Sequence, residues 1–258
     1  MTRFLLLLAL LLSTVTLRAD EKPPLRVGME MSYPPFEMTD PKGKPIGVSV
    51  DLALALGKAL GRRVEFEDIP FPGLIPALRT GKIDCIISSM TATPERSRSV
   101  AFSQPYVKTG LSLLVAKDSG VSDIPSLDQP GRTVTVKKGT TGHLYASRHL
   151  KNAKVLVFDS ESRCVLEVTQ GKADAFVYDQ ISVYVHWKKY PESTIAYLKP
   201  FQEEEWAIAV QLGNETLLRQ INEFLSEFRA KGGFDELSRK WLSDVKADFD
   251  KLGIPFFF

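Results

Sequence analysis

A run of hydroxyl side chains ending in an arginine follows an apolar stretch that is typical of a β-strand. The run, residues 88–96, reads SSMTATPER and comes directly after residues 83–87, IDCII. Thr93, which is followed by a proline, is a residue type that begins helices, so we expect Arg96 in a first helical turn. A guanidinium there could bind a carboxylate through two parallel hydrogen bonds. The same spacing also fits a surface arginine that pairs with Glu95.

Two other segments carry groups that suit the ends of a zwitterion. Residues 137–142, KKGTTG, precede a predicted helix over 143–150, and a glycine-containing helix N-terminus offers free backbone N–H groups to an anion. An ordinary glycine turn fits that segment equally well. Asp179 could accept hydrogen bonds from an ammonium. One arginine, a set of N–H groups and one aspartate could together hold both ends of a free α-amino acid.

Sequence motifs for catalysis are missing. The three histidines form no H-E-x-x-H, and there is no C-x-x-C, G-x-S-x-G, Walker loop or G-x-G-x-x-G after a strand. The acidic run Glu203–Glu205 is typical of a solvated face. We therefore expect no catalytic residue, no metal site and no cofactor, although spacing cannot reveal two carboxylates that only the fold brings together.

Composition and the N-terminus narrow the class of protein. The 258 residues include 33 Lys and Arg against 31 Asp and Glu, a balance that argues against a nucleic-acid-binding protein. Residues 1–19 have a basic start and an apolar run from Phe4 to Leu12, the pattern of a cleaved signal peptide. We predict cleavage after Ala19 and export. The two cysteines, Cys85 and Cys164, are too few for a disulfide scaffold.

Helical and strand patterns alternate along the chain, which favours an α/β fold. Asp51 is expected to cap a helix that ends at Gly61, residues 40–43 to form a hairpin turn, and two amphipathic helices to lie in the C-terminal part. Residues 78–87 and 168–177 repeat one pattern: a helix end, Gly-Lys, then x-Asp and an apolar strand. Chance at a common type of junction could explain this, but two similarly built α/β lobes fit it better. Ligands bind beyond the carboxyl ends of strands in such sheets, so Ser89 and Asp179 should face one another across a cleft.

Ordered motifs along nearly the whole chain after residue 19 resemble those of the bacterial extracellular solute-binding proteins of family 3, the polar amino-acid receptors of ABC importers. The matching segments are residues 32–37, 47–52, 74–78, 81–84, 88–96, 102–106, 139–141, 174–179 and 232–241.

The resemblance implies a two-lobed, periplasmic-binding-protein-like (type II) α/β fold. It implies two mixed sheets flanked by helices and two crossover hinge strands, near residues 106–110 and 203–207. Lobe 1 would comprise residues 20–107 and 208–258, and lobe 2 residues 108–207. Because the two cysteines then fall in different lobes on buried patterns, we predict two free thiols.

The resemblance also implies a set of ligand-binding residues. Arg96 would take the α-carboxylate with Thr91 and the N–H groups near Thr140 and Thr141. Asp179 would take the α-ammonium. The remaining positions are Ser88 and Ser89 beside these groups, Tyr33 and Phe71 on either side of the ligand side chain, and Glu30 at its far end.

The nature of the ligand side chain is less defined. Glu30 favours a cationic or hydrogen-bonding side chain and disfavours an acidic one. Ser49, however, replaces an aspartate that helps to hold the cation in the lysine- and arginine-type receptors, so basic and amide side chains both remain open.

The resemblance thus implies a monomeric periplasmic protein that captures a polar amino acid and delivers it to an ABC permease, with no nucleic-acid partner. One alternative is a periplasmic enzyme on the same fold, such as a cyclohexadienyl dehydratase, for which Glu30 is the obvious acid. Another is the sensor part of a receptor kinase or channel, against which the lack of a membrane or kinase segment after residue 242 speaks.

Overall fold

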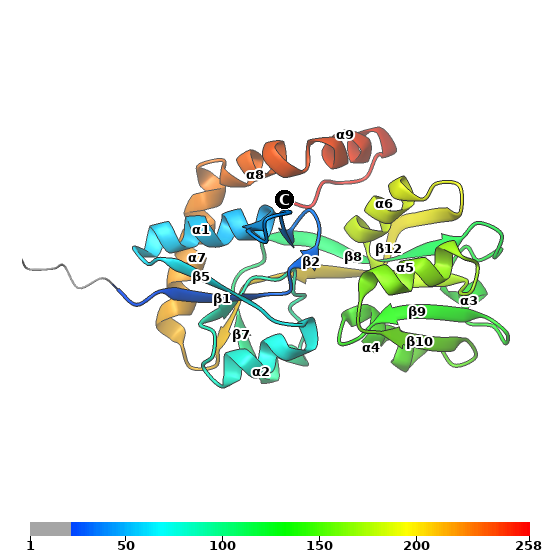
Figure 1. Ribbon diagram of the computed structural model, residues 1–258, viewed down its shortest axis with the longest axis horizontal. Coiled ribbons are helices and arrows are strands. Elements are labelled where there is room, and N and C mark those ends of the chain that lie inside the picture. Colours follow the sequence, from blue (N-terminus) through cyan, green and yellow to red (C-terminus); the bar gives the residue numbers. More distant parts are fainter. Residues whose placement is uncertain (1–21) are drawn as a thin grey trace, which may run out of the picture.

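Two separate five-stranded sheets, each the centre of a lobe, make up the protein (Figure 1). The computed structural model describes residues 22–258, so the predicted signal peptide lies outside the described residues. No helix between residues 22 and 258 is long and apolar enough to cross a membrane. The architecture is the expected α/β fold with two mixed sheets flanked by helices.

The first sheet has the strand order β5-β1-β6-β13-β7. Strand β1 is parallel to its neighbours β5 and β6, whereas β13 runs antiparallel to β6 and β7. The predicted turn at residues 40–43 joins two strands of a small three-stranded sheet. The elements of this part of the chain are β1 (Leu25–Met29), β2 (Ser32–Tyr33), β3 (Glu37–Thr39), β4 (Pro45–Ile46), α1 (Val48–Leu60), β5 (Val64–Asp68), η1 (Phe71–Gly73), α2 (Leu74–Arg79), β6 (Cys85–Ile86), η2 (Arg96–Arg98), β7 (Val100–Phe102) and β13 (Ala209–Gln211).

Helix α1 begins earlier than the sequence predicts. Its first residue is Val48 and its cap is Gly47, whose φ of 126° is open to glycine and strained for other residues. A Cβ at Gly47 would also lie 2.2 Å from the carbonyl oxygen of Phe36. The expectation that Asp51 caps this helix is therefore wrong. Asp51 instead accepts a hydrogen bond from the indole of Trp241, so it ties α1 to a C-terminal helix.

The second sheet has the strand order β10-β9-β11-β8-β12. Strand β9 is parallel to β10 and β11, and β8 runs antiparallel to β11 and β12. Helices lie against this sheet as well (Figure 1). Its elements are β8 (Val107–Ala116), α3 (Ile124–Leu127), β9 (Thr133–Lys137), α4 (Thr141–His149), β10 (Lys154–Phe158), α5 (Glu161–Thr169), β11 (Ala175–Asp179), α6 (Gln180–Lys189) and β12 (Thr194–Trp206).

Strands β8 and β12 carry the chain between the lobes (Figure 1). Where they pass between the lobes, the two strands pair in antiparallel register, with Glu203 opposite Gly110 and Trp206 opposite Val107. A Cβ at Gly110 would lie 2.3 Å from the carbonyl oxygen of Gln202, so the close approach of the two strands requires glycine there. The two crossovers therefore form one ribbon.

The repeated Gly-Lys-x-Asp pattern performs the same structural task in both lobes. Asp84 accepts hydrogen bonds from the side chain and the backbone N–H of Arg26, at 2.7 and 3.0 Å. Asp174 accepts one from the Arg132 guanidinium and one from the backbone N–H of Thr133, both at 2.7 Å. In each lobe the aspartate thus ties the start of one parallel strand to its neighbour.

The C-terminal segment packs along the first lobe and reaches the second. It holds the two predicted amphipathic helices, α7 (Glu215–Ala230) and α8 (Gly233–Trp241), and a third helix, α9 (Ser243–Leu252). Asp248 of α9 accepts hydrogen bonds from Tyr184 and Lys188 of α6, at 2.7 and 2.9 Å. After α9 the chain turns back, and Phe257 is buried against Phe36. The final phenylalanines are therefore part of the fold.

Both cysteines are free and buried, as predicted. Cys85 lies in β6 of the first sheet and Cys164 in α5 beside the second. Burial raises the pKa of each thiol to about 12, so neither forms a thiolate near neutral pH.

Candidate ligand-binding site

A cavity lies between the lobes, and all ten residues that the sequence singled out line it. They are Glu30, Tyr33, Phe71, Ser88, Ser89, Thr91, Arg96, Thr140, Thr141 and Asp179. Six further residues that the sequence analysis did not select complete the lining: Glu37, Leu111, Lys137, Tyr178, Glu204 and Trp206. Their roles as ligand contacts remain predictions that the geometry below supports.

The topology explains why these residues meet. Glu30 directly follows β1, and Ser88 and Ser89 follow β6. From the other lobe, Lys137 ends β9 and Asp179 ends β11. The carboxyl ends of parallel strands from both sheets therefore point at one another, which is where open α/β sheets place their ligands.

Arg96 lies at one end of the cavity and is almost fully buried, with 8% of its surface exposed. Its guanidinium donates to the carbonyl of Thr91 at 2.7 Å and, across the cleft, to the carbonyl of Gly139 at 3.1 Å. Burial lowers its pKa to about 10, so it is still charged at neutral pH. Its bonds to neutral carbonyls leave its positive charge without an ion-pair partner among residues 22–258. A carboxylate would suit this cation.

Thr140 sits across the cleft from Arg96, as the N-cap residue of α4. Its hydroxyl accepts a hydrogen bond from the backbone N–H of His143. Helix α4 is therefore present and begins at Thr141, two residues before the predicted start. The partial positive charge of a helix N-terminus also favours an anion at this end of the cavity.

Asp179 ends β11 in the second lobe and caps helix α6. Its Oδ1 accepts hydrogen bonds from the backbone N–H groups of Ile181 and Ser182, at 3.1 and 3.0 Å, and from the Tyr33 hydroxyl at 2.6 Å. Tyr33 belongs to the first lobe, so this bond crosses the cleft. Burial raises the pKa of Asp179 to about 7, against the effect of these hydrogen bonds. A cation beside Asp179 would favour its ionised form.

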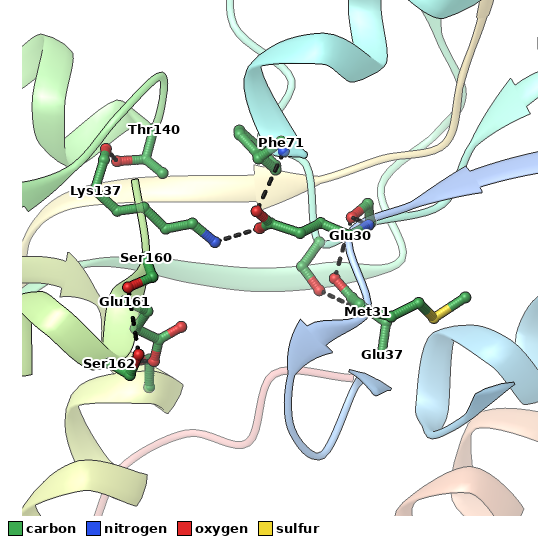
Figure 2. Close-up of polar contacts among 12 residues, drawn as sticks. Glu30, Met31, Glu37, Phe71, Lys137, Thr140, Ser160, Glu161 and Ser162 are labelled. Atoms are coloured by element: carbon green, nitrogen blue, oxygen red, sulfur yellow. Dashed lines mark hydrogen bonds and ion pairs between the residues drawn. The ribbon is translucent and has the colours of Figure 1, made fainter. Parts of the chain in front are cut away.

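Glu30 and Lys137 form an ion pair across the cleft, which Figure 2 shows. The Lys137 side chain is 2% exposed and that of Glu30 15%. The other Glu30 oxygen accepts a hydrogen bond from the backbone N–H of Phe71 at 3.3 Å. The Phe71 ring lies against both cations, with its centroid 5.3 Å from the Arg96 guanidinium and 5.9 Å from the Lys137 ammonium. Phe71 thus lies beside both cations of the cavity.

Glu37 is a fully buried acid behind Glu30. It accepts hydrogen bonds from Ser88 and Ser89, at 3.4 and 3.1 Å, and Ser88 in turn accepts from the backbone N–H of Glu30 at 3.0 Å. Burial raises the pKa of Glu37 to about 8, so it is largely protonated at neutral pH. Ser89 adopts a left-handed backbone with φ 47°, a strained conformation that places its hydroxyl on Glu37.

Glu204 links the cavity to the crossover ribbon. Its carboxylate accepts hydrogen bonds from Thr91 of one lobe and Thr141 of the other, both at 3.0 Å, and from Gln202 at 3.0 Å. Burial raises the pKa of Glu204. The interpretation of residues 203–205 as a solvated face is therefore wrong for this residue. Side chains alternate along a strand, so Glu203 and Glu205 are exposed while Glu204 points inward.

Two signals could have identified the most informative residues that sequence reasoning missed. Period-two alternation in the acidic run would have placed Glu204 on one face and its neighbours on the other. The glycine-containing pattern of residues 137–142 points to backbone N–H groups and not to the side chain of Lys137. Its position as the last residue of a predicted strand could have placed its side chain at the edge where ligands bind.

The chain is similar in sequence to known proteins. The family model described as bacterial extracellular solute-binding proteins, family 3, matches residues 25–244. The L-arginine-binding protein of Pseudomonas aeruginosa is 33% identical over 241 residues, which cover 90% of this chain and 92% of that protein.

Solved structures are similar as well. An ancestral arginine-binding protein bound to arginine has a TM-score of 0.80 and 37% identity, covering 86% of this chain and 99% of the other. The ancestral amino acid-binding protein AncCDT-1, described as a precursor of cyclohexadienyl dehydratase, has a TM-score of 0.78 and 37% identity, with 84% and 95% covered.

Proposed function

Because the chain belongs to the bacterial extracellular solute-binding proteins of family 3, we propose that it captures a free polar L-amino acid between its lobes and delivers it to the permease of an ABC importer. The relatives named above are amino-acid-binding proteins. Capture would be a hinge motion about the ribbon of β8 and β12 that encloses the ligand.

One observation carries this proposal: the cavity holds a buried cation and a buried acid, each suited to one end of an α-amino acid. Arg96 and the N-terminus of α4 would take the α-carboxylate, with the hydroxyls of Thr91 and Thr141 nearby. Asp179 would take the α-ammonium in place of the Tyr33 hydroxyl. Tyr33 and Phe71 would flank the side chain, which would extend toward Glu30.

The proposed setting is the periplasm, where the exported protein would act as a monomer, without metal or cofactor. We also propose that it binds its ligand without transforming it. Because the chain resembles AncCDT-1, the alternative function is that of an enzyme, a cyclohexadienyl dehydratase, whose substrate is prephenate. The same experiment can test both.

A thermal-shift panel tests the proposal, with the twenty amino acids, ornithine, citrulline and prephenate added separately to the purified protein. A ligand at 100 times its Kd stabilises the folded state by about 2.7 kcal/mol. In a chain of this size that corresponds to a rise in Tm of roughly 5–10 °C. We expect such a rise with one or a few polar amino acids. No rise with any amino acid, or conversion of prephenate to product, would overturn the proposal.

A further inference from the structure

Lys137 adds a positive charge at the end of the cavity where the ligand side chain would lie. It is the last residue of β9, its side chain is almost completely buried, and its ammonium contacts the carboxylate of Glu30 (Figure 2). A buried ammonium must be paired, because leaving it unpaired in a protein interior is costly. The charge of Glu30 is therefore already balanced by a residue of the chain itself.

This pairing disfavours a ligand side chain with a net charge. A guanidinium or ammonium that reached Glu30 would lie next to the Lys137 ammonium, and like charges in a desolvated site repel strongly. A carboxylate that reached Lys137 would lie next to the carboxylate of Glu30, which contacts the same ammonium. Either terminus would compete with the existing ion pair for one of its members.

The pair nevertheless retains hydrogen-bonding capacity toward the cavity that both residues line. The Lys137 ammonium has three N–H groups, and within residues 22–258 its hydrogen bond is to Glu30. The Glu30 carboxylate, with about four acceptor sites, accepts from Lys137 and from the backbone of Phe71. A donor and an acceptor therefore stand side by side.

We propose that the Lys137–Glu30 pair selects an amino acid whose side chain ends in a group without net charge that both accepts and donates hydrogen bonds. The inference rests on the proposed function. Lys137 would donate to the acceptor of that group and Glu30 would accept from its donor. Carboxamide and ureido termini have this chemistry, and so does a second zwitterionic end, as in cystine.

A matched pair of ligands tests the proposal in the unaltered protein. Citrulline and arginine have nearly the same shape, but the first ends in a neutral ureido group and the second in a guanidinium. Isothermal titration should show citrulline binding at least about tenfold more tightly than arginine, since one close charge pair changes affinity by this much or more. Glutamine and cystine in the same series show which neutral terminus is preferred, and stronger binding of either than of arginine, lysine and glutamate supports the proposal.

A substitution then assigns the effect to Lys137. Lys137→Met removes the ammonium and frees Glu30, so the ratio of citrulline to arginine affinity should fall at least about tenfold. Lys138→Met is the matched control, because Lys138 carries the same charge one residue away, is more than half exposed and does not line the cavity. Its ratio should equal that of the unaltered protein.

Each contrary result has its own meaning. Tighter binding of arginine than of citrulline, glutamine and cystine by the unaltered protein, or an unchanged ratio in Lys137→Met, overturns this inference and leaves the proposed function intact. Binding of no amino acid at all overturns the proposed function as well. If Lys137→Met does not fold, the ligand series on the unaltered protein still decides the question.

Discussion

Replacing Asp179 by asparagine separates the charge of this residue from its structural task. Asparagine caps helices as well as aspartate does, so Asp179→Asn should keep the hydrogen bonds from the backbone N–H groups of Ile181 and Ser182 that begin α6. The Tyr33 hydroxyl can still donate to the side-chain oxygen. What the substitution removes is the negative charge that we expect to meet the ligand ammonium.

The expected loss of affinity is large. Truncating one partner of a buried, hydrogen-bonded charge pair costs about 2–5 kcal/mol, or about 30- to 4,000-fold in Kd. Isothermal titration at pH 8, with the amino acid that gives the largest thermal shift, measures this directly. The Tm of the ligand-free variant should stay close to that of the unaltered protein, because the cap is retained.

The pH dependence of binding is a second signature of the same charge. Burial raises the pKa of Asp179 to about 7, so below that pH a proton must leave before the carboxylate can pair with an ammonium. Affinity should fall by up to about tenfold for each pH unit below 7. The stability of the ligand-free protein changes in the opposite direction. Between pH 3.8 and pH 7 the folded chain keeps the Asp179 proton, whereas the unfolded chain releases it. The free energy of unfolding should therefore fall as the pH rises through this range.

Asp123→Asn is the control for this experiment. Asp123 is also an aspartate at a helix N-cap, that of α3, but it does not line the cavity. Its substitution should leave the Kd and its pH dependence unchanged. The assignment of Asp179 would be refuted by Asp179→Asn binding within about fivefold of the unaltered protein, or by its keeping the same dependence on pH.

Three other predictions concern the remaining buried groups. Arg96→Lys keeps the charge but loses the planar pair of donors, so the Kd should rise at least about 30-fold; titration within a few fold of the unaltered protein would contradict this. Burial raises the pKa of Glu37 to about 8 from 4.5, so the folded chain retains a proton that the unfolded chain loses, and ligand-free stability should fall as the pH rises between these values. Glu37→Gln should reduce that fall by about 1–4 kcal/mol, which denaturant unfolding at pH 5 and pH 8 can measure, and an equal fall in both proteins would count against it. Finally, Cys85 and Cys164 should resist thiol reagents in the folded protein and give two reactive thiols once unfolded, whereas a missing thiol would indicate a disulfide.

Local signals predicted the elements on which the site is built. Glycine at the helix ends, the period of the apolar residues and the repeated Gly-Lys-x-Asp pattern are properties of short segments, and the paired roles of Asp84 and Asp174 follow from them. The start of α1 was missed because its cap is Gly47, whose side chain offers no hydrogen bond, while Asp51 looked like a cap in sequence. Helix α9 was not predicted, although its Asp248 connects the two lobes by accepting a hydrogen bond from Tyr184 of α6.

In the candidate site, the contacts between the two lobes are what the sequence could not predict. The ten predicted lining residues came from motifs that each belong to one lobe. Sequence reasoning could not predict which charges would pair across the cleft, because the partners are far apart in the chain: 107 residues separate Glu30 from Lys137, and 146 separate Tyr33 from Asp179. Such pairs depend on how one lobe is set against the other, which no single segment encodes.

These pairs across the cleft also determine where a ligand can gain binding energy. A ligand favours the closed arrangement only to the extent that its contacts there are better than those it replaces. At Arg96 a carboxylate would replace a neutral carbonyl of Gly139, and at Asp179 an ammonium would replace a phenol; both exchanges yield stronger, charge-assisted hydrogen bonds. At Glu30 a cation would replace Lys137, one full charge for another, with no comparable gain. The energy for closure should therefore come from the α-amino acid end, while the Lys137–Glu30 pair decides which side chain is accepted.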